Sequence, residues 1–265
     1  MKSITFGSLF AGIGGIDLGL ERSGMECLFQ VEKEAFPNRV LTKHWPNVEK
    51  INDIKQFRPT KKHRCDVIAG GFPCQDISNA ANNRKGLEGK RSGLWWEMLR
   101  IIEATKPSFV VIENVSSLRK RGLEQVLRSV AEIGFDAEWT IFRASDFGFA
   151  HKRERMFIVA YSNSIDWFNG RHHERFDGMG AGCELNSTAR SCKDGGDVLR
   201  WLVQAYKAFD WSPHHPGTSR KIDGIPDRVD RLRGLGNAVV PDIAEHIGRR
   251  IVSIVRHTKK TKRGN

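Results

Sequence analysis

Short apolar runs alternate with longer mixed segments through residues 1–160, and this alternation limits the fold more than any other feature of the sequence. The runs have the length of buried strands, whereas the segments at 94–102 and 123–133 repeat apolar residues at helical spacing. This pattern predicts a doubly wound, Rossmann-like α/β fold, with a mostly parallel sheet and helices on both faces. The predicted strands are Ile4–Phe10, Cys27–Val31, Asp66–Ala69, Phe109–Ile112, Ala137–Phe142 and Met156–Ala160.

The sequence changes in character after residue 160. Residues 161–222 are rich in glycine and polar side chains, and they contain one clear helical pattern, at 198–209. We therefore predict a main domain at 1–160 and a small inserted module at 161–222. Residues 223–265 are expected to return to the main domain, complete it and end in a basic tail.

The charge balance favours a polyanionic partner. Lys and Arg number 43 against 31 Asp and Glu, which gives a net charge of +12. Nucleic acid is the first candidate for the partner, and a basic enzyme that binds no polymer is the alternative. The basic residues gather at 84–91, 119–121, 152–155 and in the tail from residue 249.

The cysteines and the hydropathy exclude several classes of protein. Cys27, Cys65, Cys74, Cys183 and Cys192 form no Cys-x-x-Cys pair, so the sequence predicts neither a disulfide framework nor a metal site. No run of about 18 apolar residues is present, as a membrane span would require. We expect a monomeric protein of the cytoplasm that has no membrane partner.

A glycine-rich turn, Phe10–Gly15, follows the first predicted strand. A dinucleotide-binding fingerprint would need a third glycine where Asp17 stands, and no Gly-Lys-Ser/Thr of a P-loop is present. Glu32 ends the second strand, where nucleotide-binding folds place a carboxylate on ribose hydroxyls, and Asp53 could accept a hydrogen bond from an adenine amino group. Together they indicate a cofactor that contains adenosine.

Cys74 is the candidate nucleophile. It lies in Gly70–Gln75, just after the third strand, where open α/β sheets bind ligands. Pro73 stiffens the turn, and the polar residues that follow cannot bury a thiol well. An accessible thiolate of low pKa is therefore favoured over a buried structural cysteine.

Five short motifs in a fixed order resemble the DNA (cytosine-5) methyltransferase family, and above all its short phage and bacterial members. The match covers residues 4–160 and about 223–250. It implies an S-adenosylmethionine-dependent methyltransferase fold. The module at 161–222 has no counterpart in the match, and we assign target recognition to it because the motifs on either side serve chemistry common to every cytosine target. The motifs are Phe10–Gly15, Pro73–Gln75, Glu113–Val115, Arg153–Arg155 and Gly236–Pro241.

The resemblance assigns the catalytic roles. The Cys74 thiolate would attack carbon 6 of cytosine, because carbon 5 is otherwise a poor nucleophile. Glu113, with a raised pKa, would meet the charge at ring nitrogen 3, while Arg155 holds oxygen 2 and Arg153 supports the site or the thiolate. His151 stands where many members carry glutamine, so it is a candidate hydrogen-bonding residue.

The resemblance also implies S-adenosylmethionine as the methyl donor. The glycine turn would line it, Glu32 would bind the ribose, and the segment at 53–54 would bind the adenine. Lys33 stands where some members stack an aromatic ring on adenine, which puts that contact in doubt. The implied cofactor residues are Phe10, Gly12, Ile13, Gly14, Gly15, Glu32, Asp53, Ile54, Pro73, Leu94, Asn237 and Val239.

The implied substrate is double-stranded DNA, from which the target cytosine must be flipped out at a cost of a few kcal/mol. Residues 75–92 resemble the active-site loop of the family, and other phosphate contacts are expected from Lys152 and 119–121. The module at 161–222 would read the bases. The predicted DNA-binding residues of the loop are Gln75, Ser78, Arg84, Lys85, Lys90 and Arg91.

Three other functions remain open from the sequence. A cytosine-5 methyltransferase acting on transfer RNA would carry the same motifs, and a catalytically inactive relative could still bind DNA. A nicotinamide dehydrogenase is disfavoured by Asp17. The expected setting is a bacterial cell or a phage-infected host, in restriction–modification; the sequence leaves open whether a companion restriction endonuclease exists.

Overall fold

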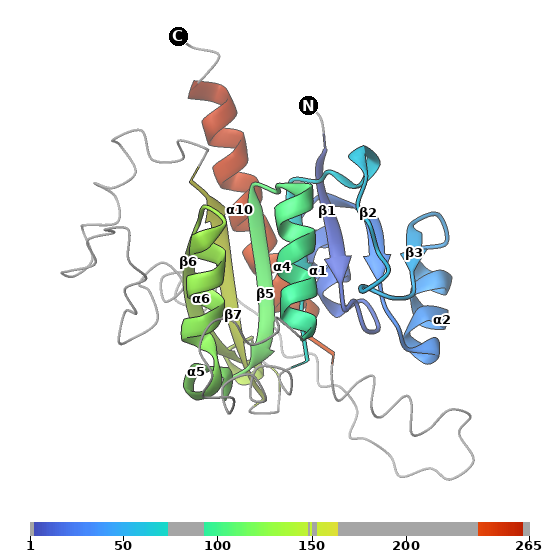
Figure 1. Cartoon of the computed structure of the whole chain (residues 1–265), viewed down its shortest axis with the longest axis horizontal. Helices are drawn as coiled ribbons and strands as arrows, with labels where there is room; N and C mark the ends of the chain where they lie inside the picture. The colour runs from blue at the N-terminus through green and yellow to red at the C-terminus, as the bar shows by residue number, and fades with distance from the viewer. Residues whose placement is uncertain (1–2, 74–92, 148, 150–152, 164–237, 262–265) are drawn as a thin grey trace, which may run out of the picture.

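The framework of the protein is a seven-stranded sheet with the strand order β3-β2-β1-β4-β5-β7-β6 (Figure 1). The computed structural model describes residues 3–73, 93–147, 149, 153–163 and 238–261, and all structural statements concern these residues. The strands are β1 (Ile4–Leu9), β2 (Met25–Val31), β3 (Glu49–Ile51), β4 (Val67–Gly70), β5 (Phe109–Val115), β6 (Phe135–Arg143) and β7 (Glu154–Ser162).

Strand direction brings the ends of several strands to one edge of the sheet. β1 to β5 pair in parallel, and β7 alone of the described strands runs against its neighbours, β5 and β6. The carboxyl ends of β1, β2, β4 and β5 therefore share an edge with the start of β7, which we call the carboxyl edge. This arrangement confirms the predicted mostly parallel, doubly wound sheet.

Every predicted strand is present, with ends that differ by a few residues. β3 was not predicted because it has only three residues, none of them buried, and it forms the outer strand beyond β2. The helices predicted at 94–102 and 123–133 correspond to α4 (Leu94–Thr105) and α6 (Leu123–Glu132). The helix predicted at 198–209 lies outside the described residues.

Helices cover both faces of the sheet, as predicted. α4 and α6 pack on one face, where Trp95, Ile101 and Val126 are buried against Ile68 and Ile112 of the strands (Figure 1). The other described helical segments are α1 (Gly15–Arg22), α2 (Ala35–His44), η1 (Lys61–His63), α5 (Leu118–Arg121), η2 (Ala144–Phe147) and α10 (Pro241–Thr261).

α1 and α10 cover the opposite face and pack closely on each other. Ile16 and Leu20 of α1 share a buried cluster with Ile243 and Ile247 of α10. A β-carbon at Gly19 would lie 2.6 Å from the β-carbon of Ala244, so the close packing of the two helices requires glycine there. α10 thus returns the chain to the core of the first domain. The boundaries predicted for the three parts of the chain, 1–160, 161–222 and 223–265, stay predictions.

None of the helices in the described ranges has the length and apolarity needed to cross a membrane.

A buried polar cluster lies beneath the glycine turn. The carboxylate of Asp17 accepts hydrogen bonds from Ser8 Oγ (3.0 Å) and Gln30 Nε2 (2.7 Å), and all three side chains are buried. Burial raises the pKa of Asp17 from 3.8 to about 6, although both hydrogen bonds act to lower it. The folded protein therefore binds this proton more tightly than the unfolded chain does.

The raised pKa of Asp17 predicts a pH-dependent loss of stability. The contribution of this group is fully present below its unfolded pKa, near 4, and is lost as the pH rises through about 6. The free energy of unfolding of wild type relative to Asp17→Asn should fall by about 2 kcal/mol between pH 4 and pH 8. Urea unfolding at both pH values measures this difference, and a constant difference would contradict the prediction.

Candidate active site

The glycine turn lies at the carboxyl edge, between β1 and α1. Gly14 has a φ of 86°, and a β-carbon there would lie 2.5 Å from the ring of Trp45, so glycine is required. Gly12 has a φ of 57°, and its missing β-carbon would meet no atom of the described residues within 4 Å. The backbone at Gly12 can therefore approach a ligand closely.

Glu32 follows β2 and shapes the same turn. Its buried carboxylate accepts hydrogen bonds from the backbone N–H of Gly12 (2.8 Å) and of Glu34 (2.7 Å). Each carboxylate oxygen can accept a further hydrogen bond, so Glu32 can both hold the turn and bind a hydroxyl donor, as predicted for a ribose. Its role in holding the turn could not be read from the sequence.

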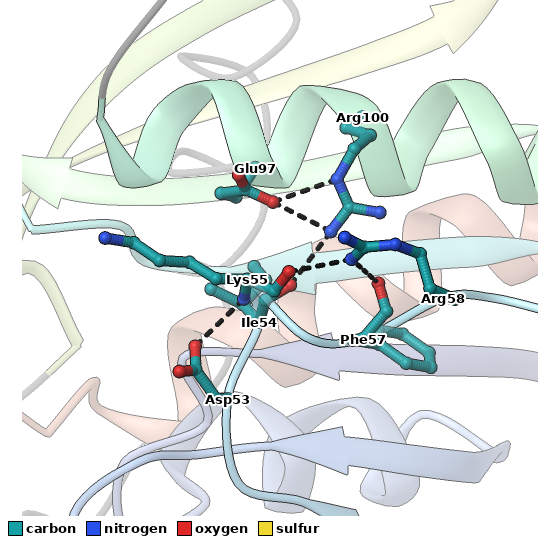
Figure 2. Close-up of polar contacts among 7 residues, drawn as sticks. All are labelled: Asp53, Ile54, Lys55, Phe57, Arg58, Glu97 and Arg100. Carbon is teal, nitrogen blue, oxygen red and sulfur yellow. Dashed lines mark hydrogen bonds and ion pairs between the residues drawn. The ribbon is translucent and has the colours of Figure 1, made fainter.

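Asp53 and Ile54 follow β3, and Figure 2 shows how this segment is held. The backbone N–H of Lys55 donates to Asp53 Oδ1 (2.9 Å). Arg100 of α4 donates to the carbonyl oxygen of Ile54 (2.9 Å) and pairs with Glu97 (2.8 Å), so the segment is tied to α4 (Figure 2). No described residue donates a hydrogen bond to Asp53 Oδ2, which can accept one from an amino group.

Other predicted cofactor residues lie around this edge. Phe10, of φ 54°, and Leu94, the first residue of α4, are partly buried against the α4/α6 side of the core, and Ile13 is partly buried in the turn. A β-carbon at Gly15 would lie 3.2 Å from the backbone nitrogen of Val239, so the turn touches the segment that leads into α10.

The turn after β4 is held from two sides and leads directly to Cys74. The ring of Phe72 packs on Trp95, with 5.0 Å between the ring centroids. Asn114, which is 4% exposed, donates from Nδ2 to the carbonyl oxygen of Phe72 (2.9 Å) and accepts the N–H of Val115 (2.9 Å) at Oδ1. The chain is thus fixed up to Phe72, and exposed Pro73 follows.

Asn114 is a residue whose role the sequence did not reveal, although it stands in a recognised motif. Asn114→Ala should lower the free energy of unfolding by about 1–3 kcal/mol, because it leaves a buried carbonyl without its donor. Asn38→Ala is the matched control. Asn38 also donates to a backbone carbonyl, that of Glu32 (2.6 Å), but it is only partly buried, so water can replace it. If urea unfolding shows that the two variants lose equal free energy of unfolding, the role given to Asn114 is contradicted.

Glu113 and Arg155 form an ion pair at the carboxyl edge. They lie on adjacent antiparallel strands, β5 and β7, and Arg155 Nε is 2.8 Å from Glu113 Oε1. A β-carbon at Gly71 would lie 2.5 Å from Glu113 Oε2, so the carboxyl group also faces the turn that precedes Cys74. The structure therefore places Glu113 and Arg155, two predicted catalytic residues, together beside the turn that leads to Cys74, the predicted nucleophile.

Burial controls the protonation of this pair. It raises the pKa of the Glu113 carboxyl to about 7, although the positive charges of Arg155 and Arg153 act to lower it. Burial also lowers the pKa of the Arg153 guanidinium, and the charge of Arg155 acts in the same direction. A carboxyl group that is partly protonated near neutral pH can serve as a general acid.

The two described cysteines are unsuited to nucleophilic chemistry. Cys27 and Cys65 are buried in the core, and burial raises the pKa of the Cys27 thiol strongly and that of Cys65 to about 12. In the described ranges no group of three His, Cys, Asp or Glu side chains is arranged to hold a metal ion.

Several predicted residues are not placed by the structure. Most of the module at 161–222 also lies outside the described residues. The predicted site residues outside them are Cys74, Gln75, Ser78, Arg84, Lys85, Lys90, Arg91, His151, Lys152 and Asn237.

Comparison with known proteins identifies relatives of the chain. Residues 4–192 match the family model of the C-5 cytosine-specific DNA methylases. The chain is 31% identical over 198 residues to the Type II methyltransferase M.Sau3AI of Staphylococcus aureus, which covers 67% of this chain and 48% of that protein. It is 35% identical over 161 residues to the Type II methyltransferase M2.BsuMI of Bacillus subtilis, and this alignment covers 58% of this chain and 41% of that protein. The chain thus spans less than half the length of these two relatives.

A solved structure resembles most of the chain. The methyltransferase EhMeth of Entamoeba histolytica aligns with a TM-score of 0.56 and 16% identity, covering 93% of this chain and 97% of that one. At this identity the likeness shows a shared fold alone.

Proposed function

Because the chain belongs to the C-5 cytosine-specific DNA methylase family, we propose that it transfers a methyl group from S-adenosylmethionine to carbon 5 of cytosine in duplex DNA. The observation that carries the proposal is the pairing of Glu113 with Arg155 at the carboxyl edge, beside the turn that leads to Cys74. A buried acid next to a guanidinium can meet both the ring nitrogen and the carbonyl oxygen of a cytosine.

The proposed reaction begins at the thiol. The Cys74 thiolate forms a bond to carbon 6, and Glu113 shares its proton with nitrogen 3 as electron density moves into the ring. Carbon 5 then becomes nucleophilic enough to take the methyl group from the sulfonium sulfur, which is left as the thioether of S-adenosylhomocysteine. Water or hydroxide removes the proton on carbon 5, the thiolate leaves carbon 6, and nitrogen 3 returns the shared proton to Glu113, which restores the aromatic ring and the enzyme. Arg155 holds oxygen 2 throughout, and Arg153 supports the site or the thiolate.

The residues of the carboxyl edge fit the methyl donor. S-adenosylmethionine, when bound, supplies an electrophilic methyl group. The open backbone at Gly12 would line it, Glu32 would accept the ribose hydroxyls, and Asp53 Oδ2 would accept the adenine amino group. Arg100 supports the last contact through Ile54, since it fixes the backbone next to Asp53.

Recognition of the target is assigned to other parts of the chain. We propose that residues 75–92 close over a flipped cytosine and that the module at 161–222 reads the surrounding bases. The enzyme would act as a monomer in the cytoplasm of a bacterial cell or an infected host. The names of the relatives place them in Type II systems, so a companion restriction endonuclease fits the proposal.

Methyl transfer to duplex DNA and to transfer RNA, measured side by side with labelled cofactor, tests the proposal. We expect incorporation into DNA alone. Bisulfite sequencing of DNA from cells that express the protein should then show methylation at one short sequence. Incorporation into transfer RNA alone would replace the proposal with an RNA methyltransferase, and no incorporation with intact DNA binding would indicate an inactive relative.

A further inference from the structure

We propose that α5 binds the phosphate backbone of DNA beside the flipped cytosine through Arg119, Lys120 and Arg121. This inference rests on the proposed function and adds a DNA-contacting surface to it. α5 begins at Leu118, three residues after β5 ends at Val115. It therefore lies at the carboxyl edge, beyond the tip of the strand that carries Glu113 (Figure 1).

The core holds α5 in a fixed position. Leu118 is fully buried in the cluster formed by α4, α6 and the sheet. The guanidinium of Arg119 lies over the ring of Trp139, 5.5 Å from its centroid, and this contact orients the first of the three cations. Successive residues of a helix point about 100° apart, so Lys120 points away from buried Leu118 and toward solvent.

At Lys120 and Arg121 the surface charge of α5 differs from that of several other described cations. Carboxylates neutralise several surface cations, among them those of the pairs Arg128–Glu124, Arg143–Glu154 and Arg249–Glu245. All three basic side chains of α5 are exposed, and no carboxylate of the described residues pairs with Lys120 or Arg121. Exposed cations beside an active site attract a polyanion and release its counterions on binding.

Charge alone does not single out α5, because the opposite edge of the sheet also carries exposed cations. Lys61 and Arg64 precede β4, and Lys106 follows α4 just before β5 begins. These three lie at the amino edge, a strand length away from Glu113. They match α5 in number and sign of charge and differ in place, so they provide the control.

The test compares two triple variants, Arg119→Gln/Lys120→Gln/Arg121→Gln and Lys61→Gln/Arg64→Gln/Lys106→Gln. Affinity for duplex DNA is measured across salt concentrations with the full chain. Each phosphate contact contributes about 0.9 to the slope of log affinity against log salt. The slope measured for the α5 variant should therefore be smaller in magnitude than that of wild type by about 0.9 to about 2.7. From 50 to 200 mM salt, wild type should lose about 3- to 40-fold more affinity than the α5 variant does.

Further readouts separate this inference from the proposed function. The α5 variant should keep its affinity for S-adenosylmethionine and its kcat at saturating DNA, with a raised KM for DNA. Of the single variants, Lys120→Gln should lower the slope most. A change in slope below about 0.9, an equal change in the amino-edge variant, or a loss confined to RNA binding would overturn the role of α5. Absence of methyl transfer to DNA by wild type would instead overturn the proposed function.

Discussion

Glu113→Gln is expected to lower the rate of methyl transfer by about 10²- to 10⁴-fold, the usual contribution of a positioned general acid. An amide has the shape of the carboxyl group but cannot supply a proton to nitrogen 3 when the thiolate attacks carbon 6. Single-turnover rates at saturating DNA and cofactor measure this loss. Binding of S-adenosylmethionine should change little, because Glu113 is not among the predicted cofactor contacts, most of which follow β1, β2 and β3.

The pH dependence of wild type should identify the same group. Burial raises the pKa of Glu113 to about 7, so the protonated acid, and with it the rate, should decrease as the pH rises through about 7. This test requires conditions in which the Cys74 thiolate does not limit the rate. Glu138→Gln is the matched control, since burial also raises the pKa of Glu138, on β6 near Arg250. A control as slow as Glu113→Gln, or a Glu113→Gln enzyme of near wild-type rate, would make Glu113 a structural residue only.

Cys74→Ser should abolish methyl transfer while cofactor binding persists. A hydroxyl ionises far less readily than a thiol, so it cannot add to carbon 6 at a useful rate. Wild type should also form a stable covalent adduct with DNA that contains 5-fluorocytosine, because fluorine at carbon 5 prevents the final elimination. Gel electrophoresis under denaturing conditions detects the adduct.

A second cysteine variant controls the adduct experiment. Cys65→Ala removes a thiol that is 8% exposed in the core, and it should leave the yield of adduct unchanged. If wild type gives no adduct, or if Cys74→Ser still gives one, covalent catalysis by Cys74 is wrong.

The sequence predicted the strands and the order of the motifs because both depend on short stretches of chain. Buried strands of four or more apolar residues stand out locally, and Glu113 was identified from its two neighbours and the family resemblance. The three residues of β3, Glu49, Lys50 and Ile51, carry no such signal. Their strand forms because they can pair with β2.

The contacts that hold the site could not be predicted in the same way. Asn114 and Phe72 are 42 residues apart, and Arg100 and Ile54 are 46 residues apart. Whether these side chains reach those carbonyls depends on how strands and helices pack in three dimensions. The ion pair of Glu113 with Arg155 likewise depends on the register between β5 and β7.

The reversed direction of β7 limits how the recognition module can be exchanged between enzymes. β7 starts at the carboxyl edge and ends at Ser162, opposite the beginning of β5, whereas α10 begins beside Gly19 of α1. The chain therefore leaves the sheet at one edge and re-enters it near the other, about 25–30 Å away for a strand of this length. The residues that join a transplanted module to α10 must bridge this distance, which takes at least about eight residues if fully extended. A graft that also removes residues 223–240 would pull α10 off α1, and a failed chimera of that kind would report on linker length instead of base recognition.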